Sequence, residues 1–374
     1  MKKTIALVLA LVLALGCLTS CGGNSKSNDA AADVKVAMIT DYGDITDQSF
    51  NQTTYEACKA FSEANSLDFS YFKPVSDSDE DRVSMIESAI DQGYNVVVMP
   101  GYAFGKAIES TAGNYPDITF IALDVSAGDF SEGYTIPANL YSAVYQEELC
   151  GYMAGVAAVK LGYTKLGFLG GMAVPAVQRY GYGFVQGADA AAAELGLSDV
   201  SVKYAYGNQF YGDADITAAM DAWYADGTEI VFACGGGIFT SAAEAAAKVS
   251  GKVIGVDVDQ AGIIDGSYGE GMTVTSAMKG LAATVNTMLQ VVVDGKFDQY
   301  GGKIDTLGLV SDVPEENYVQ LAGSTQFADG FTEADYNDLV KAMNAGEVTV
   351  SNDITKSASD FATVITVDDQ GNIK

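Results

Sequence analysis

Residues 230–260 read IVFACGGGIFTSAAEAAAKVSGKVIGVDVDQ, and this stretch decides the fold class. Near its two ends, Ile230–Ala233 and Val253–Val256 are short apolar runs bounded by turn residues, which predicts two strands. Between them, Phe239–Val249 has the residue spacing of a helix. A strand, a helix and a second strand in this order predict a parallel βαβ unit. Because both strands are apolar on both faces, we expect helices to cover both sides of the sheet.

The same alternation continues on both sides of this stretch. In the first half of the chain, strands are expected at Val36–Thr40, Phe69–Pro74, Val96–Met99 and Thr119–Leu123, and helices at Phe50–Ala64, Asp79–Gln92 and Ala103–Tyr115. After a helix at Glu147–Lys160 the series restarts, with strands at Lys165–Leu169, Val200–Tyr204 and Thr273–Met278 and helices at Ala176–Leu195, Ile216–Ala225 and Leu281–Val293. Towards the C-terminus we expect a helix at Glu333–Ala345 and a strand at Val348–Ile354.

Two successive series predict an α/β protein with two doubly wound, parallel-sheet lobes joined by a hinge. We expect lobe 1 to comprise residues 34–145 and 276–306, and lobe 2 to comprise residues 146–275 and 307–374. Such sheets bind ligands beyond the carboxyl ends of their strands, so a cleft between the lobes is the expected binding site.

The first 33 residues have the pattern of an export signal followed by a tether. Lys2 and Lys3 precede an apolar run at 5–15 that is too short to span a bilayer, which is typical of a signal peptide over residues 1–20. The sequence LTSC at 18–21 matches the bacterial lipobox, so Cys21 is the expected lipidation site and residues 21–33 a flexible tether. These features predict a lipoprotein anchored at the extracytoplasmic face of the cell membrane. An ordinary secretory signal is the alternative.

The composition excludes several classes of function. The 374 residues carry a net charge of −29, which disfavours nucleic acid as a partner and polyanionic ligands. The sequence has no histidine, which removes the commonest general base and the commonest zinc ligand. Cys58, Cys150 and Cys234 lie far apart, without the spacing of a metal or redox motif. We therefore expect a monomeric binding protein without catalytic residues, cofactor or metal.

A group of polar and aromatic residues follows the first expected strand. Asp41 and Asp47 flank a turn, and Phe50 and Asn51 begin the next helix. An aromatic face beside an amide suits a planar heterocycle, which needs stacking and a few directional hydrogen bonds. Ser49, between Asp47 and Phe50, is also a candidate ligand-binding residue. Asp47 or Ser49 could instead serve as the cap of that helix.

Further candidates follow later strands. Asp124 comes directly after the fourth strand, where it either points into the cleft or caps a loop. Asp257 and Lys279 end two other strands, and a carboxylate beside an ammonium can bind the hydroxyls of a sugar. A solvated acid and a surface lysine are the alternative. The three glycines at 235–237 allow a ligand close to the backbone. Arg179 either pairs with a carboxylate across the cleft or forms an exposed salt bridge.

Together these segments resemble the basic membrane protein family of substrate-binding lipoproteins, whose members include purine nucleoside receptors of ABC transporters. The matching segments are TDYGDITDQSFNQ, DQGYNVVVMPG, TKLGFLGGMAVP, GYGFVQG, FACGGG, VIGVDVDQ and TSAMKG, spread in family order over residues 34–294. The resemblance implies a type I periplasmic-binding-protein fold with three hinge crossings, and the permease of an ABC importer as partner.

The resemblance also implies a role for each candidate in binding a purine nucleoside. The implied contacts are Phe50 stacked on the base, Asp41, Asp47 and Asn51 flanking it, Asp124 touching it, Asp257 and Lys279 on the ribose hydroxyls, and Gly236 contributing backbone. Phe210 would be a second aromatic plate, although its loop, GNQFYGD at 207–213, is one residue longer than the family's usual turn. The glycine loop also departs from the family, since it reads GGGIF in place of GGTG.

Three other functions are compatible with these residues. A sugar-binding protein would also use Asp257 and Lys279, and a surface sensor could use the same fold with a protein partner. A nucleoside hydrolase could hold calcium with the aspartates around Asp41 and Asp47. The lack of histidine and the family segments favour a binding protein over the hydrolase.

Overall fold

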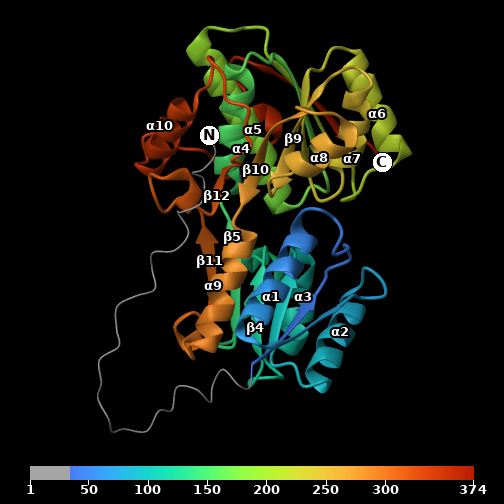
Figure 1. The fold of residues 1–374 in the computed structure, drawn as a ribbon, viewed down its shortest axis with the longest axis vertical. Coiled ribbons are helices and arrows are strands. Elements are labelled where there is room, and N and C mark those ends of the chain that lie inside the picture. The colour runs from blue at the N-terminus through green and yellow to red at the C-terminus, as the bar shows by residue number, and fades with distance from the viewer. Residues whose placement is uncertain (1–33) are drawn as a thin grey trace, which may run out of the picture.

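The computed structural model describes residues 34–374, so the expected signal peptide, Cys21 and the tether lie outside the described residues. The described chain forms two α/β lobes that lie one above the other along the long axis of the molecule (Figure 1). Within residues 34–374, no helix combines the length and the apolar character needed to cross a membrane.

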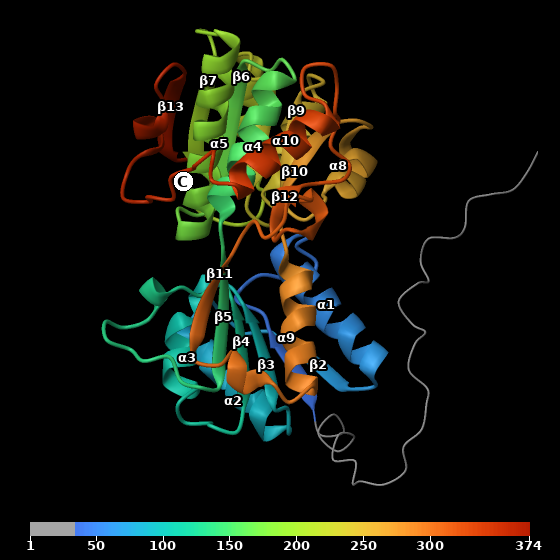
Figure 2. The same ribbon diagram turned by 90° about the vertical axis from the view of Figure 1, so that its left-hand side faces the viewer.

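The first lobe is built on six parallel strands in the order β11-β5-β4-β3-β1-β2. These strands are β1 (Lys35–Ile39), β2 (Asp68–Phe72), β3 (Val96–Pro100), β4 (Thr119–Leu123), β5 (Leu140–Tyr145) and β11 (Lys303–Leu307). Its helices are α1 (Phe50–Asn65), α2 (Asp79–Asp91), α3 (Gly105–Thr111) and α9 (Leu281–Val293). Because α1 packs beside α9 and α2 beside α3, two helices cover each face of the sheet (Figures 1 and 2).

The second lobe contains seven strands in the order β12-β10-β9-β8-β6-β7-β13, all parallel except β12. These strands are β6 (Lys165–Gly170), β7 (Ser201–Tyr206), β8 (Ile230–Cys234), β9 (Lys252–Asp257), β10 (Thr273–Lys279), β12 (Val319–Leu321) and β13 (Thr366–Asn372). Its helices are α4 (Glu147–Lys160), α5 (Pro175–Leu195), α6 (Ala214–Ala225), α7 (Phe239–Ala247), α8 (Ala261–Tyr268) and α10 (Glu333–Asn344). The unit predicted within residues 230–260 is therefore confirmed as β8-α7-β9.

Three chain crossings join the lobes: from β5 to α4, from β10 to α9, and after β11 (Figure 2). The middle crossing differs slightly from expectation. Strand β10 pairs with β9 and β12, the latter as far as Lys279, so residues 276–279, expected in lobe 1, belong to the second sheet. The hydrogen-bonded ladder continues up to the hinge, which puts Lys279 at the junction of the two lobes.

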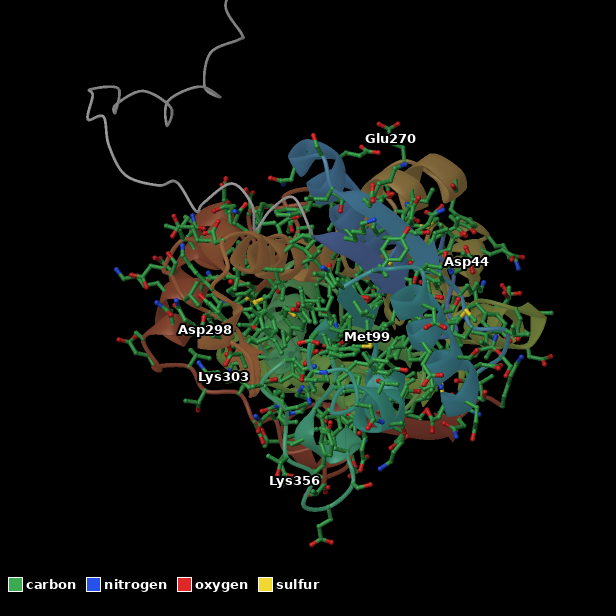
Figure 3. All side chains as sticks on the ribbon, turned by 90° about the horizontal axis from the view of Figure 1, so that it is seen from below. Asp44, Met99, Glu270, Asp298, Lys303 and Lys356 are labelled. Carbon is green, nitrogen blue, oxygen red and sulfur yellow. The ribbon has the colours of Figure 1, made fainter. Side chains whose placement is uncertain are left out.

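Apolar side chains fill the layers between sheets and helices, and charged side chains lie at the periphery. Met99 is fully buried in the first lobe, whereas Asp298 and Lys303 reach outwards (Figure 3). In the second lobe, glycines bring α4 and α5 together. A Cβ at Gly151 would lie 2.2 Å from the backbone oxygen of Tyr180, so only glycine permits this helix spacing.

The C-terminal segment departs from the sequence expectation. Residues 348–354 form no strand, and the expected strand there is wrong. Instead β13 adds a parallel edge strand beside β7. Its residues, TVDDQGN, are almost all exposed and mostly polar. The segment therefore lacks the apolar pattern by which strands are predicted. The Asp189 carboxylate anchors the approach to β13 by accepting backbone hydrogen bonds from residues 363, 364 and 365.

Candidate functional site

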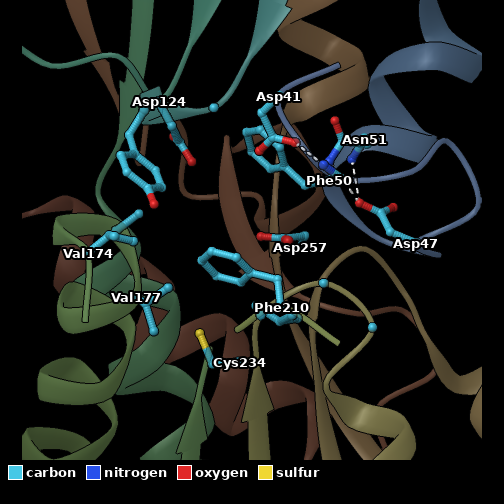
Figure 4. Close-up of a pocket in the computed structure, with 18 of the residues that line it drawn as sticks. Asp41, Asp47, Phe50, Asn51, Asp124, Val174, Val177, Phe210, Cys234 and Asp257 are labelled. Atoms are coloured by element: carbon cyan, nitrogen blue, oxygen red, sulfur yellow. Dashed lines mark hydrogen bonds between the residues drawn. The ribbon is translucent and has the colours of Figure 1, made fainter. Parts of the chain in front are cut away.

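A cavity of about 490 Å³ lies between the lobes (Figure 4). Its walls come from the loops that follow β1, β3 and β4 in the first lobe, and from the carboxyl ends of β6, β7, β8, β9 and β10 in the second. This is the edge at which open α/β sheets bind ligands. The volume is in the range of small-molecule sites, which are roughly 300–1,000 Å³.

Asp47 organises the loop that enters α1. One carboxylate oxygen accepts the backbone N–H groups of Ser49 and Gln52 at 3.0 Å, and the other accepts the backbone N–H of Asn51 at 2.9 Å. The Asn51 side-chain amide donates to the same carboxylate at 3.1 Å (Figure 4). Asp47 therefore caps the helix and lines the cavity at once, which combines the two roles considered from the sequence.

Asp41 lies beside this loop at the same end of the cavity. Its Oδ1 accepts the backbone N–H groups of Tyr42 and Gly43, both at 2.6 Å. Burial raises the pKa of Asp41 to about 6, although these hydrogen bonds act in the opposite direction. Within the described chain, Oδ1 of Asn51 is buried without a hydrogen-bond donor. This end of the cavity is thus rich in hydrogen-bond acceptors. A buried acceptor without a donor costs free energy, which a ligand that supplies the donor would recover.

At the hinge end, Lys279 is surrounded by three carboxylates. Its Nζ lies 2.6 Å from Asp124, 3.4 Å from Glu147 and 3.6 Å from Asp257, and its side chain is only 3% exposed. Burial lowers the pKa of Lys279, but the carboxylates outweigh this effect and hold the pKa well above its usual range. The same Nζ lies 4.9 Å from the centre of the Phe50 ring. Lys279 is therefore a buried, charged donor at the junction of both lobes.

The carboxylates around Lys279 are held by unusual backbone and side-chain geometry. Asp124 and Asp257 both have positive φ angles, +60° and +64°, at the ends of their strands. Such left-handed conformations are strained for residues other than glycine and are often found at functional sites. Oδ1 of Asp124 is buried without a hydrogen-bond partner in residues 34–374, so it remains open to a donor in the cavity.

Two further charged residues complete this cluster: Glu147 lies behind the cavity wall, and Arg179 lines the cavity. Nε of Arg179 lies 2.7 Å from Glu147, which is fully buried at the start of α4. Burial raises the pKa of Glu147, while Arg179 and Lys279 oppose that rise. Arg179 thus pairs with a buried carboxylate of its own lobe, and neither alternative considered from the sequence is correct. Glu147 was missed; its only signal was an acid at the start of an apolar helix directly after a hinge crossing.

The wall contributed by the second lobe is mostly apolar and glycine-rich. The Phe210 ring packs on glycines, because a Cβ at Gly171 would lie 2.4 Å from it and one at Gly235 would lie 2.9 Å from it. The backbone N–H of Gly237 donates to the Phe210 carbonyl at 2.9 Å and fixes the loop. Phe50 and Phe210 lie on opposite sides of the cavity, one from each lobe (Figure 4).

Nine of the ten residues predicted for the site line this one cavity; they are Asp41, Asp47, Phe50, Asn51, Asp124, Phe210, Gly236, Asp257 and Lys279. The tenth, Ser49, is fully buried outside the lining, and its Oγ donates to Asp257 at 2.6 Å. Two tyrosines that also line the cavity, Tyr42 and Tyr102, were not predicted; their hydroxyls lie 3.2 Å apart.

Comparisons with known proteins bear on this geometry. Residues 34–344 match the family of ABC transporter substrate-binding proteins described as PnrA-like. An ABC transporter nucleoside-binding protein of Lactococcus lactis is 31% identical over 332 residues, which cover 83% of this chain and 90% of the relative. A CD4+ T-cell-stimulating antigen of Listeria innocua is 29% identical over 336 residues, covering 82% and 90%.

Solved structures show the same fold. A solute-binding protein of an ABC transporter system from Aeropyrum pernix superposes with a TM-score of 0.65 at 21% identity, covering 88% of this chain and 90% of that one. One from Conexibacter woesei gives 0.65 at 22% identity, covering 85% and 99%. The lobes therefore have the type I periplasmic-binding-protein arrangement expected from the sequence. By its family match, the chain belongs to the PnrA-like ABC transporter substrate-binding proteins, and it is a solute-binding protein and not an enzyme.

Proposed function

We propose that this protein captures a purine nucleoside in the cavity between its lobes and delivers it to the permease of an ABC importer. The observation that carries the proposal is the arrangement of the cavity. A buried ammonium among carboxylates occupies one end, hydrogen-bond acceptors occupy the other, and an aromatic ring from each lobe lies on either side. The likeness to the Lactococcus lactis nucleoside-binding protein supports the same ligand class.

The hinge end suits a ribose. Lys279 can donate a hydrogen bond to a hydroxyl oxygen, and Asp257 and Asp124 can each accept a hydrogen bond from a hydroxyl group. A vicinal diol would therefore satisfy both the ammonium and the carboxylates. Because three carboxylates already neutralise Lys279, the site offers little attraction to a phosphate. A neutral nucleoside therefore suits this end better than a nucleotide.

The opposite end suits a base. The rings of Phe50 and Phe210 can stack on the two faces of a heterocycle, a geometry that favours flat aromatic ligands. The carboxylates of Asp41 and Asp47 and the free Oδ1 of Asn51 can accept N–H donors from its edge. Gly236 leaves the backbone open to the ligand on the second lobe.

Transport requires binding and release without a covalent step. A ligand that touches both lobes stabilises the closed arrangement, as in other hinge-closing binding proteins. We propose that lipid on Cys21 anchors the protein at the extracytoplasmic face of the cell membrane, with residues 21–33 as the tether. We also propose that it acts as a monomer.

Calorimetric titration with guanosine, inosine, cytidine and free ribose tests the proposal. We expect the purine nucleosides to bind with 1:1 stoichiometry, cytidine more weakly because its ring is smaller, and ribose least because it lacks the stacking part. Tight binding of ribose with no response to any nucleoside would replace the proposal by a sugar-binding function. Release of free base from the nucleoside during the titration would instead reveal a hydrolase.

A further inference from the structure

Besides the Lys279–Asp124 bond in the cavity and the contacts of the Tyr42 and Tyr102 hydroxyls with Met172, two further hydrogen bonds join the lobes beside the cavity. Ser49, at the start of α1 in the first lobe, donates its hydroxyl to Oδ2 of Asp257 at 2.6 Å, and Asp257 ends β9 in the second lobe. Nearby, the side-chain amide of Gln260 donates to the backbone carbonyl of Gln48 at 3.1 Å. Neither Ser49 nor Gln260 lines the cavity, so both bonds can form without a ligand.

The Ser49 hydroxyl fixes the orientation of a carboxylate that faces the cavity. With Oδ2 of Asp257 engaged by Ser49, Oδ1 is turned to Lys279 at 3.6 Å and to the Tyr180 hydroxyl at 3.4 Å. Asp257 is only 6% exposed, so losing its hydroxyl donor would leave a poorly solvated carboxylate oxygen. Separation of the lobes breaks this bond, because donor and acceptor belong to different lobes.

The backbone on both sides of the contact is held in strained conformations. Gln48, whose carbonyl accepts the second bond, has φ +57°, and Asp257 has φ +64°. The Oε1 of Gln260 accepts the backbone N–H of Val256 at 2.9 Å, so the same side chain is tied to the end of β9. Strain of this kind persists only where surrounding contacts enforce it, and here the contacts include bonds within each lobe and the two bonds between them.

We propose that Ser49 is a positioning residue that orients Asp257 for the ligand only when the lobes are closed. The role of Ser49 in ligand binding depends on the nucleoside site proposed above, whereas its contribution to lobe closure does not. The Asp257 carboxylate then takes up its binding orientation at the same time as the lobes close. The bonds from Ser49 and Gln260 also stabilise the closed form before any ligand arrives.

Ser49→Ala tests this proposal, and Ser62→Ala is its matched control. Ser62 is a buried serine of the same helix whose hydroxyl has no hydrogen-bond partner in residues 34–374. Two measurements are made on the full chain: the lobe separation of the unliganded protein, from scattering and from dyes at Val75 and Glu270, and the dissociation constant and dissociation rate of inosine. Val75 and Glu270 are exposed, one in each lobe.

We expect Ser49→Ala to shift the unliganded protein towards the open form and to weaken inosine binding roughly 10–100-fold, as loss of a hydrogen bond to a charged group does. Most of the change should be in the dissociation rate, because the bond forms on closure. Ser62→Ala should leave both measurements at the wild-type values. Gln260→Glu, which keeps the acceptor for Val256 but puts a buried carboxylate oxygen against the Gln48 carbonyl, should also open the protein.

An unliganded Ser49→Ala protein with the wild-type lobe separation would overturn the contribution to closure. Unchanged inosine affinity in that variant would overturn the positioning role. If the wild-type protein itself does not bind nucleosides, the proposed function fails, and the lobe separation of the variants still decides whether Ser49 holds the lobes together.

Discussion

The two ends of the cavity hold their carboxylates in different ways. At the hinge end, Asp124 and Asp257 share the ammonium of Lys279 with Glu147. At the opposite end, Asp41 and Asp47 accept backbone N–H groups of their own loop. An ion cluster supplies both a donor and acceptors, whereas a carboxylate held by N–H groups supplies acceptors alone. The cavity can therefore distinguish one end of an asymmetric ligand from the other.

Removing the central cation should have the largest effect, because it leaves three buried carboxylates facing one another. For Lys279→Ala we expect the free energy of unfolding to fall by roughly 3–5 kcal/mol, with loss of nucleoside binding. Denaturant unfolding and calorimetry measure the two effects. Lys296→Ala removes an exposed lysine far from the cavity and should change neither. Nucleoside binding that survives in Lys279→Ala would contradict the ribose assignment.

Removing an aromatic ring should have the next largest effect, because the ring contributes stacking while all the charges of the ion cluster remain. Phe50→Ala should weaken nucleoside binding by about 2–3 kcal/mol through lost burial and stacking. Isothermal calorimetry of the variant measures the change. Tyr71→Ala, which truncates an exposed ring outside the cavity, is the control and should bind as the wild type does. Equal affinity of Phe50→Ala and wild type would remove Phe50 from the site.

Protonation of Asp41 should make ligand binding at the acceptor end depend on pH. Asp41, with its pKa raised to about 6, should accept ligand donors only when ionised, so affinity should be about tenfold weaker at pH 5 than at pH 7. Stability should change in the opposite direction. Because burial raises this pKa above the unfolded value, the contribution of Asp41 is full below pH 4 and is lost as the pH rises through 6.

Asp41→Asn separates this response from other titrations. Glu148, whose pKa burial raises to about 7, is present in both proteins and cancels in the comparison. Between pH 5 and pH 7, inosine affinity should rise more steeply in the wild type than in Asp41→Asn. Equal slopes in the two proteins would assign the pH response to another group.

The smallest effect is expected at the rim. Lys73 and Asp44 form a pair at 2.7 Å, and both side chains are about half exposed. Lys73→Ala should change nucleoside affinity by less than about 1 kcal/mol, since exposed ion pairs contribute little. Repeating the calorimetry at high salt checks this, because screening should remove what little difference exists. A larger loss would indicate that Lys73 contacts the ligand directly.

Much of this architecture follows from the sequence by physical rules. Parallel strands put their carboxyl ends on one edge of their sheet, so the residues after β1 and β4 meet in the first lobe and the ends of β8 and β9 meet in the second. The two edges then face each other across the cavity. The glycines at 235–237 stood out because glycine lets the backbone come close to a neighbour, and at Gly235 a Cβ would lie only 2.9 Å from the Phe210 ring. These rules explain why nine predicted residues, scattered over more than 200 positions, line one cavity.

The errors have physical causes as well. Ser49 was predicted for the ligand together with the polar and aromatic residues of its segment, and sequence spacing does not reveal that its side chain turns to the other lobe. Glu147 was overlooked because a buried acid depends on partners, Arg179 and Lys279, that lie far away in the sequence. The polar edge strand β13 depends on pairing with β7 rather than on its own pattern.

A crystal structure of the protein with bound inosine would test most directly whether one ligand spans both ends of the cavity. We predict the ribose hydroxyls within hydrogen-bond distance of Asp257 and Lys279, and the base between Phe50 and Phe210 with its edge towards Asp41. Inosine bound in the reverse orientation, or in contact with only one of the two ends, would contradict the account.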